Sequence, residues 1–187
     1  MSYVDDLLAS YRRFVRLPWP RNVAHAQRVW MAIYPPEHER RLRLNVPEFA
    51  TATKQAGHGW QLIDITTSFE VWMANHEYRD AYFESPELLE PALADFFDQL
   101  CDRVRSDLSL ADADENTVVG LLGAGSLFGL GSHVKVSALL AEVNRAIQGR
   151  LLVFFPGEHD GNSYRLLDAR DGGNYLATPI TANGSRT

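Results

Sequence analysis

Apolar residues recur along this chain in two patterns, and the first of them predicts helices. Between residues 2 and 16 they are spaced by three and four, which predicts an amphipathic helix. Ser2 with Asp5 resembles a capping pair at its start. The proline at position 86, directly after Ser85, is a strong start for a later helix. The further predicted helices span residues 36–56, a short segment from 66 to 73, 85–108 and 134–148.

The second pattern is a short, continuous apolar run, which predicts a buried strand. Turn-forming clusters at residues 159–162 and 171–174 indicate hairpins near the C-terminus. The predicted strands are "VWMAIY" (29–34), "WQLIDI" (60–65), "TVVGLL" (117–122), "RLLVFF" (150–155), "YRLLDA" (164–169) and "YLATPI" (175–180).

This alternation of strands and helices predicts the fold class. Strands joined through helices make right-handed crossovers and a parallel sheet. We therefore expect a three-layer α/β fold, with a mainly parallel sheet and helices on both faces. Residues 1–187 are interpreted as one domain with a parallel core at 28–156. A C-terminal antiparallel meander, residues 150–180, is expected at one edge of the sheet.

Composition narrows the class of protein. The chain is 45% hydrophobic and 22% charged, as is typical of a folded globular protein. It has no apolar stretch of about 18 residues and no secretory signal pattern, and its single cysteine, Cys101, excludes an intrachain disulfide. We expect a cytoplasmic protein without membrane contact. The net charge of −6 favours weak or indirect nucleic-acid binding at most. Its two arginine groups, at 12–16 and 40–43, are better explained as solvated helix faces than as phosphate contacts.

A glycine-rich stretch, "VVGLLGAGSLFGLG" at 118–131, raises the question of nucleotide binding. A Walker A loop requires lysine after its second glycine, but Ser126 follows Gly125, and Lys135 lies too far along the chain. The dinucleotide fingerprint fails as well, because Phe128 occupies the third glycine position. No working nucleotide motif is present.

Three interpretations of this loop remain: a structural turn, a partner contact, and a weak anion or nucleotide site. The residues that would contact a phosphate are Gly123, Gly125 and Ser126. The apolar residues that would contact a protein are Leu127, Phe128 and Leu130. Loops after parallel strands share one edge of a sheet, so residues 123–133 are expected beside 156–162. Glu158 and His159 would then form a polar rim around the apolar centre.

Other candidate chemistry is sparse. Tyr78, Tyr82 and Phe83 lie in an aromatic-rich connection that either packs on the core or contacts a partner. The six histidines show no metal-ligand spacing, so neither a metal nor a cofactor is expected. We find no complete catalytic motif and predict that the protein is not an enzyme.

Five stretches of the chain together resemble one known family. These are "YRRFVRLPWPRNVAHAQRVWMAIY", "KQAGHGWQLIDIT", "EYRDAYFESPE", "GLLGAGSLFGLGSHVKVSALL" and "GRLLVFFPGEHDGNSYRLLDARDGGNYLATPI". The sequence is similar over most of its length to BrxB, the small component of bacterial BREX anti-phage systems. The resemblance implies a cytoplasmic accessory protein of phage defence, encoded beside a methyltransferase, a large ATPase and the phosphatase-superfamily protein PglZ. It implies PglZ and other BREX components as partners, and no catalytic residues.

The leading hypothesis is therefore a non-catalytic assembly or adaptor subunit of a BREX defence complex. One alternative is a nucleotide-binding or regulatory module that uses the glycine-rich loop, residues 123–131. Another is an RNA- or DNA-binding accessory protein. The missing lysine argues against the first alternative, and the negative net charge argues against the second.

Overall fold

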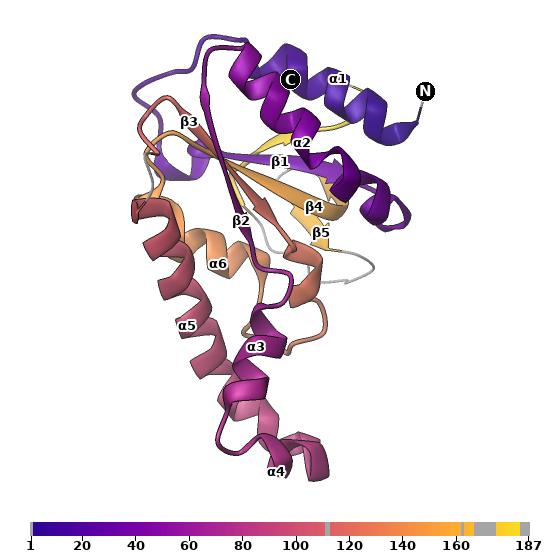
Figure 1. The fold of residues 1–187 in the computed structure, drawn as a ribbon, viewed down its shortest axis with the longest axis vertical. Helices are drawn as coiled ribbons and strands as arrows, with labels where there is room; N and C mark the ends of the chain where they lie inside the picture. The colour runs from indigo at the N-terminus through magenta and orange to yellow at the C-terminus, as the bar shows by residue number, and fades with distance from the viewer. Residues whose placement is uncertain (1, 111–112, 162, 167–174, 184–187) are drawn as a thin grey trace.

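The computed structural model describes residues 2–110, 113–161, 163–166 and 175–183, and its centre is a parallel β-sheet (Figure 1). The strands lie in the order β2-β3-β4-β1-β6, and every neighbouring pair in this order is parallel. A further strand, β5, pairs antiparallel with the end of β4. The bounds are β1 Val29–Tyr34, β2 Gly59–Asp64, β3 Thr117–Leu122, β4 Arg150–Asp160, β5 Ser163–Leu166 and β6 Thr178–Ile180.

Helices cover both faces of the sheet, which confirms the predicted three-layer α/β fold (Figure 1). On one face lie α1 (Tyr3–Val15) and α2 (Glu39–Gln55), and α1 begins with the capping box of Ser2 and Asp5. On the other lie α3 (Ser68–Asn75), α5 (Leu89–Leu110) and α6 (Val136–Val143).

The strand side chains divide between these two layers by strict alternation. In β1, Trp30, Ala32 and Tyr34 join the core under α1 and α2. Val29 and Met31 face the core under α5 and α6. All six residues of β1 are buried, as they are in β3. Burial on both faces explains why these strands are continuous apolar runs in the sequence.

The C-terminal segment differs from the predicted meander. The hairpin of β4 and β5 is antiparallel, but β6 pairs with β1 in parallel, with Met31 opposite Pro179. The strand β6 therefore forms the edge of the sheet next to β1 rather than lying beside β5. The predicted turn at residues 171–174 lies outside the described residues.

One end of the molecule extends away from the sheet. The "EYRDAYFESPE" stretch, expected to be a connection, contains a short helix, α4 (Arg79–Glu84), followed by a 3₁₀ turn at Pro86–Leu88. These elements meet α3 and the first turn of α5 beyond the layered core (Figure 1). We call residues 69–89 the distal end.

Candidate functional site

The glycine-rich loop is held tightly by its neighbours. Gly123 has a φ of 98°, and a Cβ atom there would lie 2.5 Å from the backbone nitrogen of Thr66. The hydroxyl of Ser126 donates a hydrogen bond to the carbonyl oxygen of Gly123 over 2.7 Å. The space above Gly123 is thus filled by Thr66, and the Ser126 hydroxyl is already engaged. This geometry favours a structural turn over a phosphate cradle.

The apolar residues of the loop do not form one surface. Leu127 closes a 3₁₀ turn, Ala124–Leu127, and is only 2% exposed within the core under α5 and α6. Leu130 is partly buried against the same core. Phe128 alone projects, with 47% of its surface exposed. Leu127 therefore belongs to the core, and Phe128 is the most exposed of the three apolar side chains of this loop.

The loop does lie beside the end of β4, as the shared edge of a parallel sheet requires. A Cβ atom on Gly125 would sit 3.1 Å from Cγ of Pro156. Beyond Pro156, Glu158 and His159 belong to the β4–β5 hairpin rather than to a solvated turn. Glu158 is exposed and 4.0 Å from Arg165, whereas Nδ1 of His159 is buried and has no partner among the described residues.

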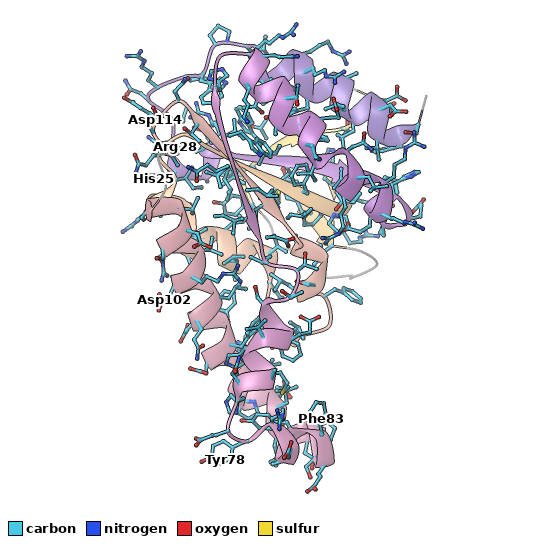
Figure 2. The ribbon with its side chains drawn as sticks, viewed as in Figure 1. His25, Arg28, Tyr78, Phe83, Asp102 and Asp114 are labelled. Carbon is cyan, nitrogen blue, oxygen red and sulfur yellow. The ribbon has the colours of Figure 1, made fainter. Side chains whose placement is uncertain are left out.

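The distal end exposes more large apolar side chains than the glycine-rich loop does. Tyr78 is 58% exposed, Phe83 is 70% exposed and Leu88 is 53% exposed. Figure 2 shows Tyr78 and Phe83 projecting from the end of the molecule that lies furthest from the sheet. Tyr82, the second predicted aromatic contact, is half-buried and packs against the core.

Beside these side chains lies an apolar groove of about 530 Å³. It runs between α3, α4, the 3₁₀ turn and the start of α5. Its larger apolar lining residues are Phe69, Met73, Tyr82, Phe83, Pro86 and Leu89. A groove of this size with an exposed aromatic at its edge suits an apolar side chain of a protein partner.

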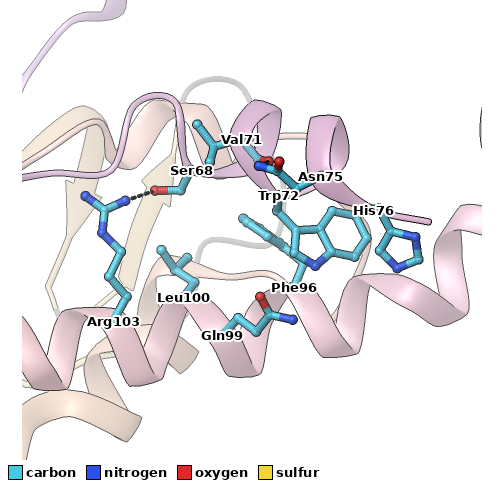
Figure 3. Close-up of a pocket in the computed structure, with 9 residues that line it drawn as sticks. All are labelled: Ser68, Val71, Trp72, Asn75, His76, Phe96, Gln99, Leu100 and Arg103. Carbon is cyan, nitrogen blue, oxygen red and sulfur yellow. Dashed lines mark hydrogen bonds between the residues drawn. The ribbon is translucent and has the colours of Figure 1, made fainter. Parts of the chain in front are cut away.

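A second cavity, of about 360 Å³, lies on the other side of α3 (Figure 3). Its walls are tied by polar contacts between α3 and α5: Nε1 of Trp72 donates to Asp95 over 3.2 Å, and Arg103 donates to Ser68 over 2.9 Å. His76 lies at its end with its ring centroid 4.7 Å from that of Trp72. The groove and this cavity flank α3, which packs mainly on α4 and α5 and leaves half of its residues exposed.

Three of the arginines on α1 and α2 are neutralised by neighbouring carboxylates. Arg12 pairs with Glu48 at 3.3 Å, and Arg41 pairs with Asp5 at 3.2 Å. The third pair joins Arg43 to Glu39 at 2.7 Å. These pairings agree with the interpretation of solvated helix faces.

In the described part of the chain, no three histidine, cysteine, aspartate or glutamate side chains come together as a metal site would require. None of the helices described is both long and apolar enough to cross a membrane.

Part of the distal end can be predicted from the sequence, but its groove cannot. Tyr78, Tyr82 and Phe83 stand out as an aromatic-rich connection. The apolar spacing of the helix predicted at 85–108 makes Leu88 a buried residue, and this prediction is wrong, because Leu88 is 53% exposed. The groove itself depends on how four short elements pack, and no local pattern encodes that packing.

The chain matches no family model, no curated protein and no solved structure in the comparisons with known proteins.

Proposed function

We propose that this protein is a non-catalytic adaptor subunit that binds another protein through its distal end, within a BREX-type phage-defence assembly. The observation that carries the proposal is the exposed apolar surface of Tyr78, Phe83 and Leu88 beside an open groove of about 530 Å³. Clustered exposed apolar side chains on a folded protein are typical of a contact surface.

The composition of this surface also favours a protein partner. Aromatic side chains and arginine are enriched among the residues that dominate binding energy at interfaces. The distal end provides Tyr78, Phe83 and Arg79, and Arg79 is exposed next to Asp80. A polar rim around an apolar centre is the usual arrangement of such surfaces.

The identity of the partner is supported by the family resemblance alone. Similarity to the BrxB family suggests a PglZ-like protein of the phosphatase superfamily, with other BREX components nearby. The alternative of a nucleotide-binding module at residues 123–131 has less support, because Thr66 fills the space over Gly123. Arginine pairing on α1 and α2 leaves the nucleic-acid alternative weaker still.

The test is co-expression of the chain with a PglZ-like protein of a BREX system, followed by affinity capture and a Kd measurement on the purified pair. Phe83→Ala should weaken binding by about 2 kcal/mol, roughly thirtyfold, as truncation of an interface anchor does. Phe83 is 70% exposed, so the variant should fold as the wild type does.

Two controls separate this surface from others. Phe128→Ala removes the same side chain from the glycine-rich loop, where Phe128 is 47% exposed. Leu44→Ala removes a 74% exposed apolar side chain from α2. Both should bind as the wild type does. Loss of binding in Phe128→Ala but not in Phe83→Ala would move the interface to the loop, and absence of any complex would refute the adaptor function.

A further inference from the structure

A polar pocket of about 540 Å³ lies at the other end of the molecule, where the parallel strands begin. Figure 2 shows Arg28 and Asp114, which line it, at the end opposite Tyr78 and Phe83. Arg28 directly precedes β1, and Arg150 is the first residue of β4. Ligands of parallel α/β sheets usually bind at the carboxyl ends of the strands, so fold type alone does not predict this pocket.

The central cation of the pocket is Arg150, which is only 6% exposed. Its guanidinium donates hydrogen bonds to the carbonyl oxygens of Pro20 over 2.8 Å and Gly149 over 3.0 Å. It also lies over the rings of Trp19 and Trp30, at 5.2 and 5.9 Å from their centroids. Among the described residues, no carboxylate comes within 4.0 Å of it. Arg150 is therefore a buried charge without a counter-ion.

A second guanidinium, Arg28, reinforces this positive charge. Its Nη1 donates to the carbonyl oxygens of Ile147 over 2.8 Å and Gln148 over 3.2 Å. Its Nε is buried and has no partner in the described part of the chain. Burial and the nearby charge of Arg28 lower the pKa of Arg150, so the two cations repel each other. Burying like charges together is costly unless an anion is bound between them.

The pocket's other polar groups do not neutralise these arginines. The carboxylate of Asp114 accepts hydrogen bonds from the hydroxyl of Thr117 over 2.8 Å and from the backbone of Asn116 over 2.9 Å. Glu115 is exposed at the rim. Arg16 and Arg21, both exposed, add two further cations.

The aromatic ring of His58 also lines the pocket, next to Trp19. It stacks on Trp19 with ring centroids 3.8 Å apart, and its Nδ1 lies 2.6 Å from the amide oxygen of Asn116. The Asn116 amide nitrogen donates to Gly57, which directs its oxygen toward the imidazole. These two contacts hold the imidazole ring in one orientation.

We propose that this pocket binds a small phosphorylated ligand of nucleotide size, with its phosphate held by Arg28 and Arg150. Guanidinium groups bind phosphate oxygens through paired, charge-assisted hydrogen bonds, and the half-buried Arg28 lines the pocket. The volume of about 540 Å³ lies in the range of small-molecule sites and exceeds what a bare phosphate fills. The acidic rim and the net charge of −6 disfavour a long polyanion such as DNA.

The experiment is titration of the purified protein with adenosine 5′-monophosphate, inorganic phosphate and adenosine, in chloride buffer of matched ionic strength. Binding is followed by calorimetry and by tryptophan fluorescence, because Trp19 lines the pocket and the ring of Trp30 lies 5.9 Å from the Arg150 guanidinium. The nucleotide and phosphate should bind saturably, and adenosine should bind more weakly than the nucleotide. Equal binding of adenosine and the nucleotide would overturn the assignment to phosphate.

The variant used to test the proposal is Arg28→Gln, because replacing the buried Arg150 could prevent folding. It should lower nucleotide affinity by about tenfold or more, since hydrogen bonds to a charged group are lost. Without ligand, its melting temperature should fall by no more than about 4 °C, because loss of the hydrogen bonds to Ile147 and Gln148 is offset in part by the relieved repulsion with Arg150. The matched control is Arg12→Gln, on α1, whose arginine pairs with Glu48 outside the pocket.

Three outcomes would refute this proposal. The first is no saturable binding of phosphate or nucleotide at millimolar concentrations. The second is an equal effect of Arg28→Gln and Arg12→Gln on affinity. The third is tighter binding of a single-stranded oligonucleotide than of the mononucleotide, which would indicate a polyanion site.

Discussion

Gly123→Ala tests whether the glycine-rich loop is a structural turn. Two costs add at this position. The φ of 98° places the residue in the left-handed region, which costs a residue with a Cβ atom about 1–2 kcal/mol. The new Cβ atom would also lie 2.5 Å from the nitrogen and 2.8 Å from Cα of Thr66, and backbone atoms cannot rotate away. Overpacking of this kind costs about 1–3 kcal/mol, so the free energy of unfolding should fall by about 2–5 kcal/mol.

Gly129→Ala is the matched control, because it shares only the first of these costs. Gly129 has a φ of 80°, and a Cβ atom there would meet nothing within 4 Å. Its substitution should cost about 1–2 kcal/mol. Urea denaturation followed by circular dichroism measures both values, and a difference of 1 kcal/mol moves the midpoint by roughly 0.3–1 M. Equal losses in the two variants would refute the close packing of Gly123 on Thr66.

Two further predictions concern other buried and exposed positions. Leu127→Ala should lower the free energy of unfolding by about 2–5 kcal/mol, because Leu127 is 2% exposed. Phe128→Ala should lower it by no more than about 1 kcal/mol, because Phe128 is 47% exposed. Equal losses of the two variants in urea denaturation would contradict this assignment. Cys101 is 2% exposed, and burial raises its pKa to about 11, so at pH 8 the folded protein should react slowly with Ellman's reagent and the urea-unfolded protein rapidly; rapid reaction of the folded protein would show that this thiol is accessible.

The layered core could be predicted from sequence because its strands are buried on both faces. Residues 29–34 and 117–122 were predicted with the observed bounds. Continuous apolar runs bounded by polar or proline residues leave little choice of where such strands begin and end. By contrast, β4 was predicted to end at 155, because Pro156 and Gly157 resemble a strand end in sequence. In the structure it continues to Asp160. In the fold, Gly157 pairs with Leu166, and a Cβ atom on it would lie 2.0 Å from the carbonyl oxygen of Arg165.

Features that depend on long-range packing were not predictable in the same way. The direction of β6 is set by how the chain returns to β1, and its three residues carry no information about parallel pairing. Within the glycine-rich loop, Leu127 is buried and the next residue, Phe128, is exposed. A 3₁₀ turn of four residues is too short to show a hydrophobic period, so adjacent apolar residues there cannot be told apart from sequence.

The cationic pocket illustrates the same limit at a larger scale. Arg28 and Arg150 are far apart in the sequence, and neither stands in a recognisable motif: Arg28 ends a short 3₁₀ helix, His25–Arg28, and Arg150 follows Gly149. The parallel pairing of β1 with β4, with Val29 opposite Leu151, brings the two starts of these strands together. The two arginines lie together only because β1 and β4 are parallel neighbours and start at the same end of the sheet. In the sequence, the basic groups therefore stand out only on the predicted helices, and nothing marks the two arginines at the strand starts.

The two candidate sites differ in both chemistry and position, and this separation gives each proposal an internal control. The distal end is apolar and lies beyond the layered core, whereas the cationic pocket lies where the strands begin, at the opposite end (Figure 2). Their lining residues do not overlap. Charges separated by more than about 10 Å of solvent are largely screened at ordinary salt, so removing the charge of Arg28 should not act directly on Phe83. A variant that lost both nucleotide and partner binding would therefore indicate a folding defect, and selective loss of one function would assign it to its own end of the molecule.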